Sequence, residues 1–154
     1  MSKLYVEKQV DVNASARRVW AILTEKESTI EWASEFSLGG PRLHLESNWD
    51  YGSPVLWKDQ DGAVIVEGTV TAIEPGILLR YTVFNAEGPR PQASPEDGIT
   101  FKLTERDGRT RVWVSQGDFS SMPEGAKYRN MSEEIWDRAL ARIKRLAERP
   151  ASSH

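Results

Sequence analysis

Large aromatic side chains are the residues of this sequence best suited to binding a small molecule. Six tryptophans among 154 residues are many for a chain of this length. Pockets for small molecules are lined mainly by apolar and aromatic side chains, with a few directed polar groups. We therefore predict a ligand-binding role for Trp32, Trp57, Tyr81, Phe101, Trp136 and Leu140. The alternative is that these side chains only fill the core, since aromatic residues contribute large buried areas.

Two ionisable residues are candidates for acid–base chemistry. Glu67 lies in an apolar stretch beside Gly68, and burial there would raise its pKa and suit it to general acid or base work. Its parity differs from that of Val64 and Val66, which favours a position facing solvent. His44 is the only histidine outside the terminal tail, where a surface or strand-edge position is the simpler interpretation. We assign no catalytic residue and keep these two as the candidates.

Several other kinds of site are excluded or unsupported. The chain has no cysteine, which rules out disulfides, zinc–thiolate sites and thiol catalysis. A single histidine outside the tail argues against a multi-histidine metal site. The glycines do not form a phosphate-binding loop motif. We therefore predict no metal and no cofactor.

Composition and charge narrow the class of protein. Apolar residues make up 39% of the chain and charged residues 28%, proportions typical of a soluble globular domain. The net charge is −3, and lysine and arginine are spread along the chain with only a mild concentration in the last helix, where acidic residues are interleaved. We therefore do not expect nucleic-acid binding. The N-terminus lacks the apolar stretch of a signal peptide, and no run is long enough to cross a bilayer. We expect a cytoplasmic protein that does not insert into membranes.

The elements that would position these residues follow from hydrophobic periodicity. Alternation over residues 4–12 predicts a half-buried strand. Asn13 and Ser15 can cap a helix whose stripe is Ala16, Val19, Trp20 and Leu23, and a second short helix is expected near 27–34. Extended segments follow from residue 36 onward, among them 55–57, 64–73, 78–84, 99–103 and 112–114. Within the last of these, Trp113 has the opposite parity to its neighbours and is expected on the outer face.

A long amphipathic helix closes the chain. Ser132, with Glu133 and Glu134 nearby, is typical of a helix start, and Ile135, Ala139 and Ile143 lie on one stripe. The stretches 85–98 and 117–128 are expected to be loops, and each is either a lid over a pocket or a simple connection. We predict one domain over 1–149 and a tail over 150–154. Its fold class is α+β, with a curved antiparallel sheet wrapped around the C-terminal helix and two short helices after the first strand.

The order of the motifs resembles a known family. Residues 12–24 (VNASARRVWAILT), 49–57 (WDYGSPVLW), 67–75 (EGTVTAIEP), 79–82 (LRYT), 108–112 (GRTRV) and the helix over 136–146 follow the pattern of AHSA-type domains. These domains are a branch of the START-like or SRPBCC superfamily, which has the helix-grip fold of the birch-pollen allergen. The resemblance covers nearly the whole chain. It departs from the family at Gln116, where many relatives carry histidine, and this counts against a histidine acid–base centre there.

The resemblance implies a fold and a range of functions. The family is named after an activator of the ATPase of the ninety-kilodalton heat-shock chaperone, an activity that depends on an additional N-terminal domain outside these 154 residues. Other members of the superfamily bind lipids, hormones and polyketides, and some catalyse cyclisation or dehydration.

Three functions remain open. The first, which we favour, is binding of an unidentified small hydrophobic ligand in a closed cavity between the sheet and the C-terminal helix. The second is a protein-interaction or chaperone-associated module, which predicts an exposed apolar patch. The third is an enzyme of the cyclase or dehydratase type, which predicts an ionisable group with a shifted pKa in the pocket.

Overall fold

The computed structural model describes residues 4–37, 39–86, 98–120 and 124–149. Eight strands, three α-helices and one 3-10 turn are assigned in these ranges. In chain order they are β1 (Val6–Val12), α1 (Ala16–Thr24), α2 (Lys26–Ala33), η1 (Ser34–Ser37), β2 (His44–Glu46), β3 (Pro54–Lys58), β4 (Val64–Glu74), β5 (Leu78–Tyr81), β6 (Phe84–Asn85), β7 (Gly98–Arg106), β8 (Arg109–Gly117) and α3 (Gly125–Glu148).

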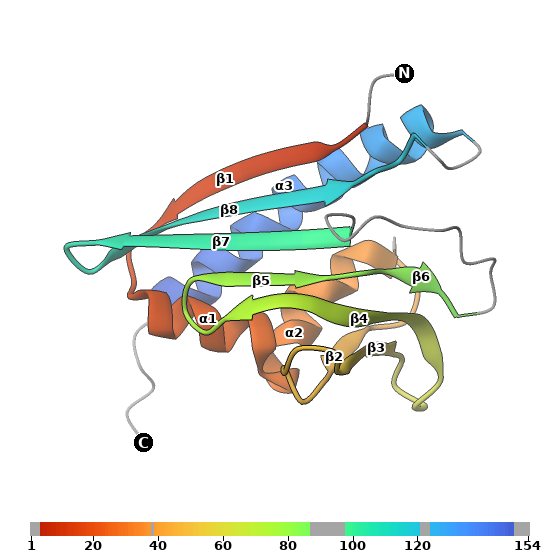
Figure 1. The fold of residues 1–154 in the computed structure, drawn as a ribbon, viewed down its shortest axis with the longest axis horizontal. Helices are drawn as coiled ribbons and strands as arrows, with labels where there is room; N and C mark the ends of the chain where they lie inside the picture. Colours follow the sequence, from red (N-terminus) through yellow and green to blue (C-terminus); the bar gives the residue numbers. More distant parts are fainter. Residues whose placement is uncertain (1–3, 38, 87–97, 121–123, 150–154) are drawn as a thin grey trace.

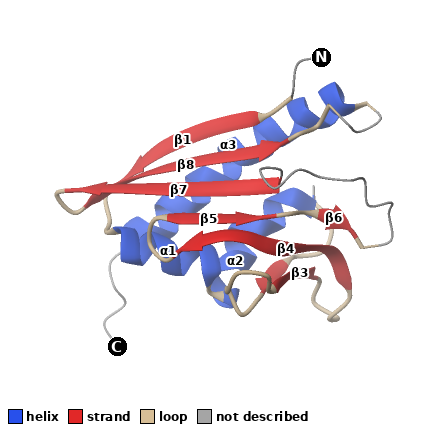
Figure 2. Cartoon of the chain, in the orientation of Figure 1, coloured by secondary structure: helices blue, strands red, loops and turns tan. Residues whose placement is uncertain are grey.

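The strands form one antiparallel sheet. Its order is β1-β8-β7-β5-β4-β3-β2, and the short β6 pairs with β4. Figure 1 shows α3 crossing behind β1, β8 and β7, while α1 and α2 lie behind β5 and β4. The helices therefore all cover the same side of the sheet (Figure 2). The predicted α+β architecture, a curved antiparallel sheet with a long C-terminal helix and two short helices after the first strand, is confirmed.

Alternation on the central strands sets the inner face of the sheet. Val112 and Val114 of β8 are fully buried, and Trp113 between them is partly exposed on the other face, as predicted. The ammonium group of Lys102 lies 4.9 Å from the Trp113 ring centroid. The outer face of the sheet is thus polar with a few aromatic rings, and the apolar inner face packs against the helices.

Local sequence explains where α1 begins. The Ser15 hydroxyl accepts a hydrogen bond of 3.2 Å from the Arg18 amide, so one orphan donor of the first turn is satisfied. Val19, Ile22 and Leu23 are buried, and Trp20 packs against the core while partly exposed. Of the two predicted capping residues, Ser15 is confirmed as the N-cap and Asn13 is not the cap. The predicted stripe is confirmed.

The predicted start of the C-terminal helix is wrong. Helix α3 begins at Gly125, ahead of the capping signature around Ser132. The turns of α3 before Ser132 carry few apolar residues, so the sequence shows no amphipathic pattern that would predict a helix there. Tertiary contacts hold them instead: Arg129 Nε donates to the Tyr5 carbonyl at 3.0 Å, and Gly125 lies directly against the Phe119 carbonyl.

Candidate functional site

The six side chains predicted to bind a ligand come together between the sheet and α3. They are supplied by α2 (Trp32), β3 (Trp57), β5 (Tyr81), β7 (Phe101) and α3 (Trp136 and Leu140). All six are buried, and four of them are fully inaccessible to solvent. Their convergence follows from strand parity and the helical stripe. Their role in binding stays a prediction.

An aromatic cluster lies at the centre of this region. We define it as Trp32, Phe36, Trp57, Phe101 and Trp136. The Trp32 ring lies 6.3 Å from Trp57, 5.9 Å from Phe101 and 6.2 Å from Trp136, measured between centroids. It stacks on Trp136 with an interplanar angle of 29°, while the other two contacts are edge-on, the geometry that ring quadrupoles favour.

Phe36 belongs to the cluster and was missed by the sequence analysis. We expected residue 36 to begin an extended region, but it lies in η1, which continues directly from α2. Its ring contacts Trp136 at 4.9 Å and Trp57 at 5.5 Å. Phe36 is only partly buried, so it lies between the cluster and solvent. Because a 3-10 turn has no long hydrophobic period, the sequence carried no clear signal for it.

Most buried polar atoms around the cluster have partners. The indole N–H of Trp32 donates to the Ile22 carbonyl at 2.9 Å, and that of Trp49 donates to the Thr24 carbonyl at 2.9 Å. The indole N–H of Trp136 donates to Gln116 Oε1 at 2.8 Å. Gln116, the residue that departs from the family pattern, therefore holds a core tryptophan in place.

Two buried polar atoms differ from the rest. Among the described residues, Trp57 Nε1 and the Tyr81 hydroxyl have no hydrogen-bond partner. Burial also raises the pKa of Tyr81 far above its usual value, so this hydroxyl stays neutral and able to donate. Leaving such a group unpaired in a core costs about 1–3 kcal/mol. The two atoms lie on β3 and β5, the strands on either side of β4.

The described residues form at least two surface hollows. The larger, of about 620 Å³, lies between the α2–η1 segment and α3 and is lined by Glu31, Ser34, Glu35, Gly39, Arg42, Arg138 and Arg142. The smaller, of about 300 Å³, is lined by Tyr5, Glu7, Arg80, Thr100, Lys102, Trp113 and Ser115 on the outer face of the sheet. Neither is the closed apolar cavity that we predicted, and the aromatic cluster occupies the space between sheet and α3.

Glu35 ties η1 to α3 in the larger hollow. It accepts hydrogen bonds from Arg142 Nε at 2.6 Å and Arg138 Nε at 3.0 Å. Partial burial pushes the pKa of Glu35 upward, but the hydrogen bonds and charges of the two arginines outweigh it and hold that pKa below its usual range. The carboxylate form is therefore favoured by folding.

Acid should weaken this tie. Because the pKa of Glu35 is lower in the folded chain, its contribution is complete above the unfolded pKa of about 4.3 and is lost as the pH falls through the folded pKa. We expect Glu35→Gln to lower the free energy of unfolding at pH 7, and the gap to wild type to shrink at about pH 3. Urea unfolding at both pH values measures this. Glu27→Gln, at an exposed position of α2, is the control for the loss of one negative charge. If the stability difference between Glu35→Gln and wild type did not change with pH, the ion pairs of Glu35 would not contribute to stability.

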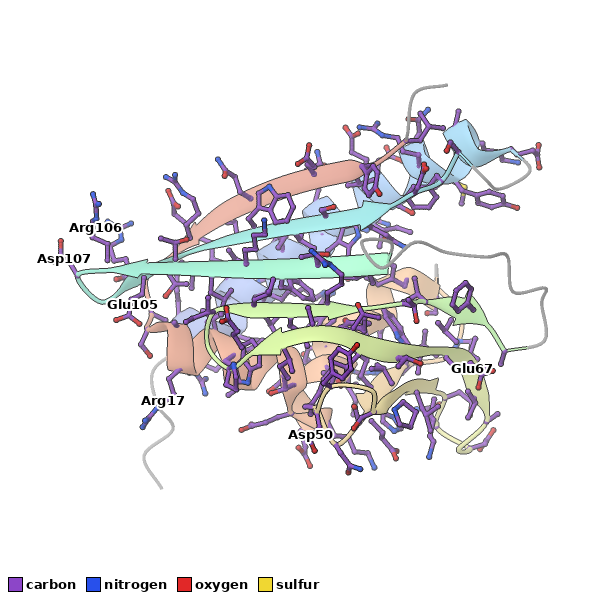
Figure 3. The ribbon with its side chains drawn as sticks, in the orientation of Figure 1. Arg17, Asp50, Glu67, Glu105, Arg106 and Asp107 are labelled. Atoms are coloured by element: carbon purple, nitrogen blue, oxygen red, sulfur yellow. The ribbon has the colours of Figure 1, made fainter. Side chains whose placement is uncertain are left out.

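The two acid–base candidates lie outside the aromatic cluster, and both are partly buried. His44 is on the edge strand β2 with its Nε2 2.6 Å from Glu46 Oε2. Hydrogen bonds from His44 and Lys58 hold the pKa of Glu46 below its usual range. Glu67 is partly exposed on β4 and pairs with Leu56 and Phe84. Figure 3 shows it at the end of the sheet opposite Glu105, Arg106 and Asp107 of the β7–β8 hairpin.

Some predictions lie partly or wholly outside the described residues. Residues 87–97 of the first suggested lid, residues 121–123 of the second, and the tail over 150–154 are among these. In the ranges that the structure does describe, no cluster of three histidine, aspartate or glutamate side chains could hold a metal ion. No helix in those ranges is long and apolar enough to cross a membrane.

Solved structures with the same fold are numerous. A protein from Mesorhizobium loti, MLL2253, aligns with a TM-score of 0.72 and 20% identity, over 96% of this chain and 99% of its own. The Aha1 dimer from Colwellia psychrerythraea aligns with a TM-score of 0.70 and 15% identity, over 97% and 99%. ChR145 from Cytophaga hutchinsonii gives a TM-score of 0.68 and 24% identity, over 96% and 97%. At these identities the likeness shows the fold alone.

The family comparison covers most of the chain. No curated protein matches it, but the family model described as activator of Hsp90 ATPase homolog 1-like protein matches residues 13–148. This range begins two residues before Ser15, the N-cap of α1, and ends at Glu148, the last residue of α3. It includes every member of the aromatic cluster. The chain therefore belongs to the activator of Hsp90 ATPase homolog 1-like family, an AHSA-type branch of the START-like superfamily.

Proposed function

We propose that this domain binds a small, mostly apolar molecule carrying at least one polar atom, between the sheet and α3. The observation that carries the proposal is the pair of unpartnered buried atoms, Trp57 Nε1 and the Tyr81 hydroxyl. The indole groups of Trp32, Trp49 and Trp136 all have partners in the same core. A ligand oxygen that accepts from Trp57 or pairs with Tyr81 would offset the cost of leaving these groups bare.

The surroundings of the two atoms support an apolar ligand. Trp57 contacts Trp32 and Phe36 through ring edges, and the Tyr81 ring lies 5.9 Å from that of Trp49. Pockets that bind small molecules combine such walls with a few fixed polar groups. Room for the ligand requires one ring to move. Phe36 is the least restrained, because it lies on a short turn and is partly exposed.

The direct test is a search for a bound molecule. Native mass spectrometry of the purified protein should reveal an apolar adduct at one-to-one stoichiometry, and denaturing extraction should release it for identification. A protein without an adduct that also binds none of a panel of fatty acids, flavonoids and polyketides would contradict the proposal.

Tyr81→Phe tests the unpartnered hydroxyl itself. The substitution should raise the free energy of unfolding of the ligand-free protein by about 1 kcal/mol, because it removes an unsatisfied polar group and keeps the ring. It should also weaken binding of the extracted ligand. Urea unfolding and calorimetric titration measure the two effects.

The control makes the same chemical change at the surface. Tyr51 is 78% exposed, and Tyr51→Phe should change neither stability nor binding. If Tyr81→Phe instead destabilised the protein by more than about 1 kcal/mol, the hydroxyl would have a partner inside the fold. The main support for a polar group on the ligand would then be lost.

A further inference from the structure

Three arginines line the larger hollow, and they come from distant parts of the sequence. Arg138 and Arg142 lie one turn apart on α3, and Arg42 follows η1. Among the described residues, the carboxylates in the same lining are Glu31 and Glu35. The guanidinium charges therefore exceed the carboxylate charges by one, in a protein whose net charge is −3. The hollow is a local exception that favours an anion.

The arginines keep donors available. Arg138 and Arg142 both reach Glu35 through Nε, and Arg42 reaches Glu31 through one terminal nitrogen at 2.7 Å. Across the described ranges of the chain, the terminal nitrogens of Arg138 and Arg142 have no hydrogen-bond acceptor in the protein. A guanidinium group has five N–H donors in a rigid planar fork. Glu35 thus orients the two groups while most of their donors stay free.

The free donors are accessible. The side chains of Arg138 and Arg142 are 51% and 42% exposed, whereas that of Glu35 is 18% exposed. An incoming carboxylate or phosphate could therefore meet the terminal nitrogens without first displacing Glu35. Arginine pairs bind such planar or tetrahedral anions with short, charge-assisted hydrogen bonds.

The hollow adjoins the aromatic cluster through one short turn. In η1, Glu35 bonds to the arginines of the hollow, and the next residue, Phe36, packs on Trp57 and Trp136. A molecule with a charged end at the arginines would therefore have its apolar part beside Phe36, the ring that has to move for the proposed ligand.

We propose, building on the proposed function, that the ligand is an anionic amphipath whose carboxylate or phosphate group is bound by Arg138 and Arg142 in this hollow. Its mostly apolar chain passes Phe36 into the aromatic cluster, where a second polar atom of the ligand would meet Trp57 Nε1 or the Tyr81 hydroxyl. Arg42 is already paired with Glu31, so the excess positive charge of the hollow lies at Arg138 and Arg142.

The test compares three probes that share one chain: dodecanoate, dodecyl phosphate and dodecanol. The two anions are used below their micelle concentrations and the alcohol below its solubility limit. We expect the wild-type protein to bind at least one anion about tenfold more tightly than the neutral alcohol, the difference of one charge-assisted pair. The ratio of the affinities for dodecanoate and dodecyl phosphate shows whether the site prefers a carboxylate or a phosphate headgroup. Calorimetric titration at pH 7.5 and physiological salt measures all three.

Two variants change the anion affinity in opposite directions. Arg138→Gln with Arg142→Gln should abolish the preference for anions, so that the anionic probes bind no more tightly than dodecanol. Glu35→Gln removes a negative charge beside the two guanidinium groups and keeps an amide oxygen that can accept from their Nε atoms. It should therefore tighten anion binding severalfold, an effect that a purely structural role of Glu35 would not produce. Arg145→Gln with Arg149→Gln, at exposed positions of the same helix end, removes equal charge outside the hollow and should change nothing.

The outcomes separate the two proposals. Equal affinity for anions and alcohol in wild type, or an anion preference that survives the Arg138/Arg142 double substitution, would overturn the headgroup site and leave the proposed function intact. Failure of all three probes, together with a bare protein in native mass spectrometry, would count against both.

Discussion

Replacing Trp136 with alanine should lower the free energy of unfolding by about 3–5 kcal/mol. The indole is fully buried, stacks on Trp32 and meets Phe36 and Phe101 through ring edges at 4.9 and 5.6 Å. Its loss would leave a cavity at the centre of the aromatic cluster, because the sheet and α3 can collapse only in part. It would also remove the donor to Gln116 Oε1.

The control for Trp136→Ala is Trp113→Ala, the same change on the outer face of the sheet. Trp113 is partly exposed and contacts Lys102, so its truncation should cost about 1 kcal/mol. Urea unfolding compares the free energies of unfolding of the two variants, on the condition that their m-values are equal. Similar losses at both positions would mean that the cluster contributes no more to stability than the outer surface does.

Much of the inner face could be predicted from the sequence because its signals are local. Alternation places Val112 and Val114 on one side of β8 and Trp113 on the other. The i, i+4 stripe of Ile135, Ala139 and Ile143 sets the buried face of α3. Once the parity of each strand and the stripe of each helix are fixed, the large residues on those faces have to converge. All six predicted lining residues are buried for this reason.

Features that depend on how elements meet could not be predicted in this way. Phe36 joins the cluster because η1 continues from α2 and points its ring at Trp136, a direction that no period in the sequence records. The first turns of α3 are held by contacts with Tyr5 and Phe119. The arginine-lined hollow combines Arg42 with two residues of the last helix, so it arises only from the tertiary fold.

The same limit applies to the predicted cavity. Residue types fix which side chains face inward, but the distance of α3 from the sheet decides whether they enclose space or fill it. In the described structure the rings are in contact with one another. The two unpartnered polar atoms and the adjacent arginine-lined hollow are therefore the features on which the proposal of ligand binding rests.

Gly68→Ala should destabilise the protein by about 3 kcal/mol or more, although it adds only one methyl group. Gly68 is buried in β4 opposite Val55 of β3. A Cβ atom there would lie 1.6 Å from the Thr82 carbonyl oxygen, and backbone atoms cannot rotate away as a side chain could. The strand would have to separate from residue 82, breaking the bond of 3.0 Å from the Thr82 amide to the Thr69 carbonyl. Tyr81, next in the chain, would then shift within the core.

Gly76→Ala is the matched control for this prediction. Gly76 lies in the turn between β4 and β5 with φ +80° and open space around the added carbon, so alanine there should cost only about 1 kcal/mol of backbone strain. Urea unfolding compares the two variants, and binding of dodecanoate tests whether the displacement reaches the site. A Gly68→Ala protein as stable as the control would mean that β4 and the Thr82 segment can separate freely. The position of Tyr81 would then depend on the helices rather than on the sheet.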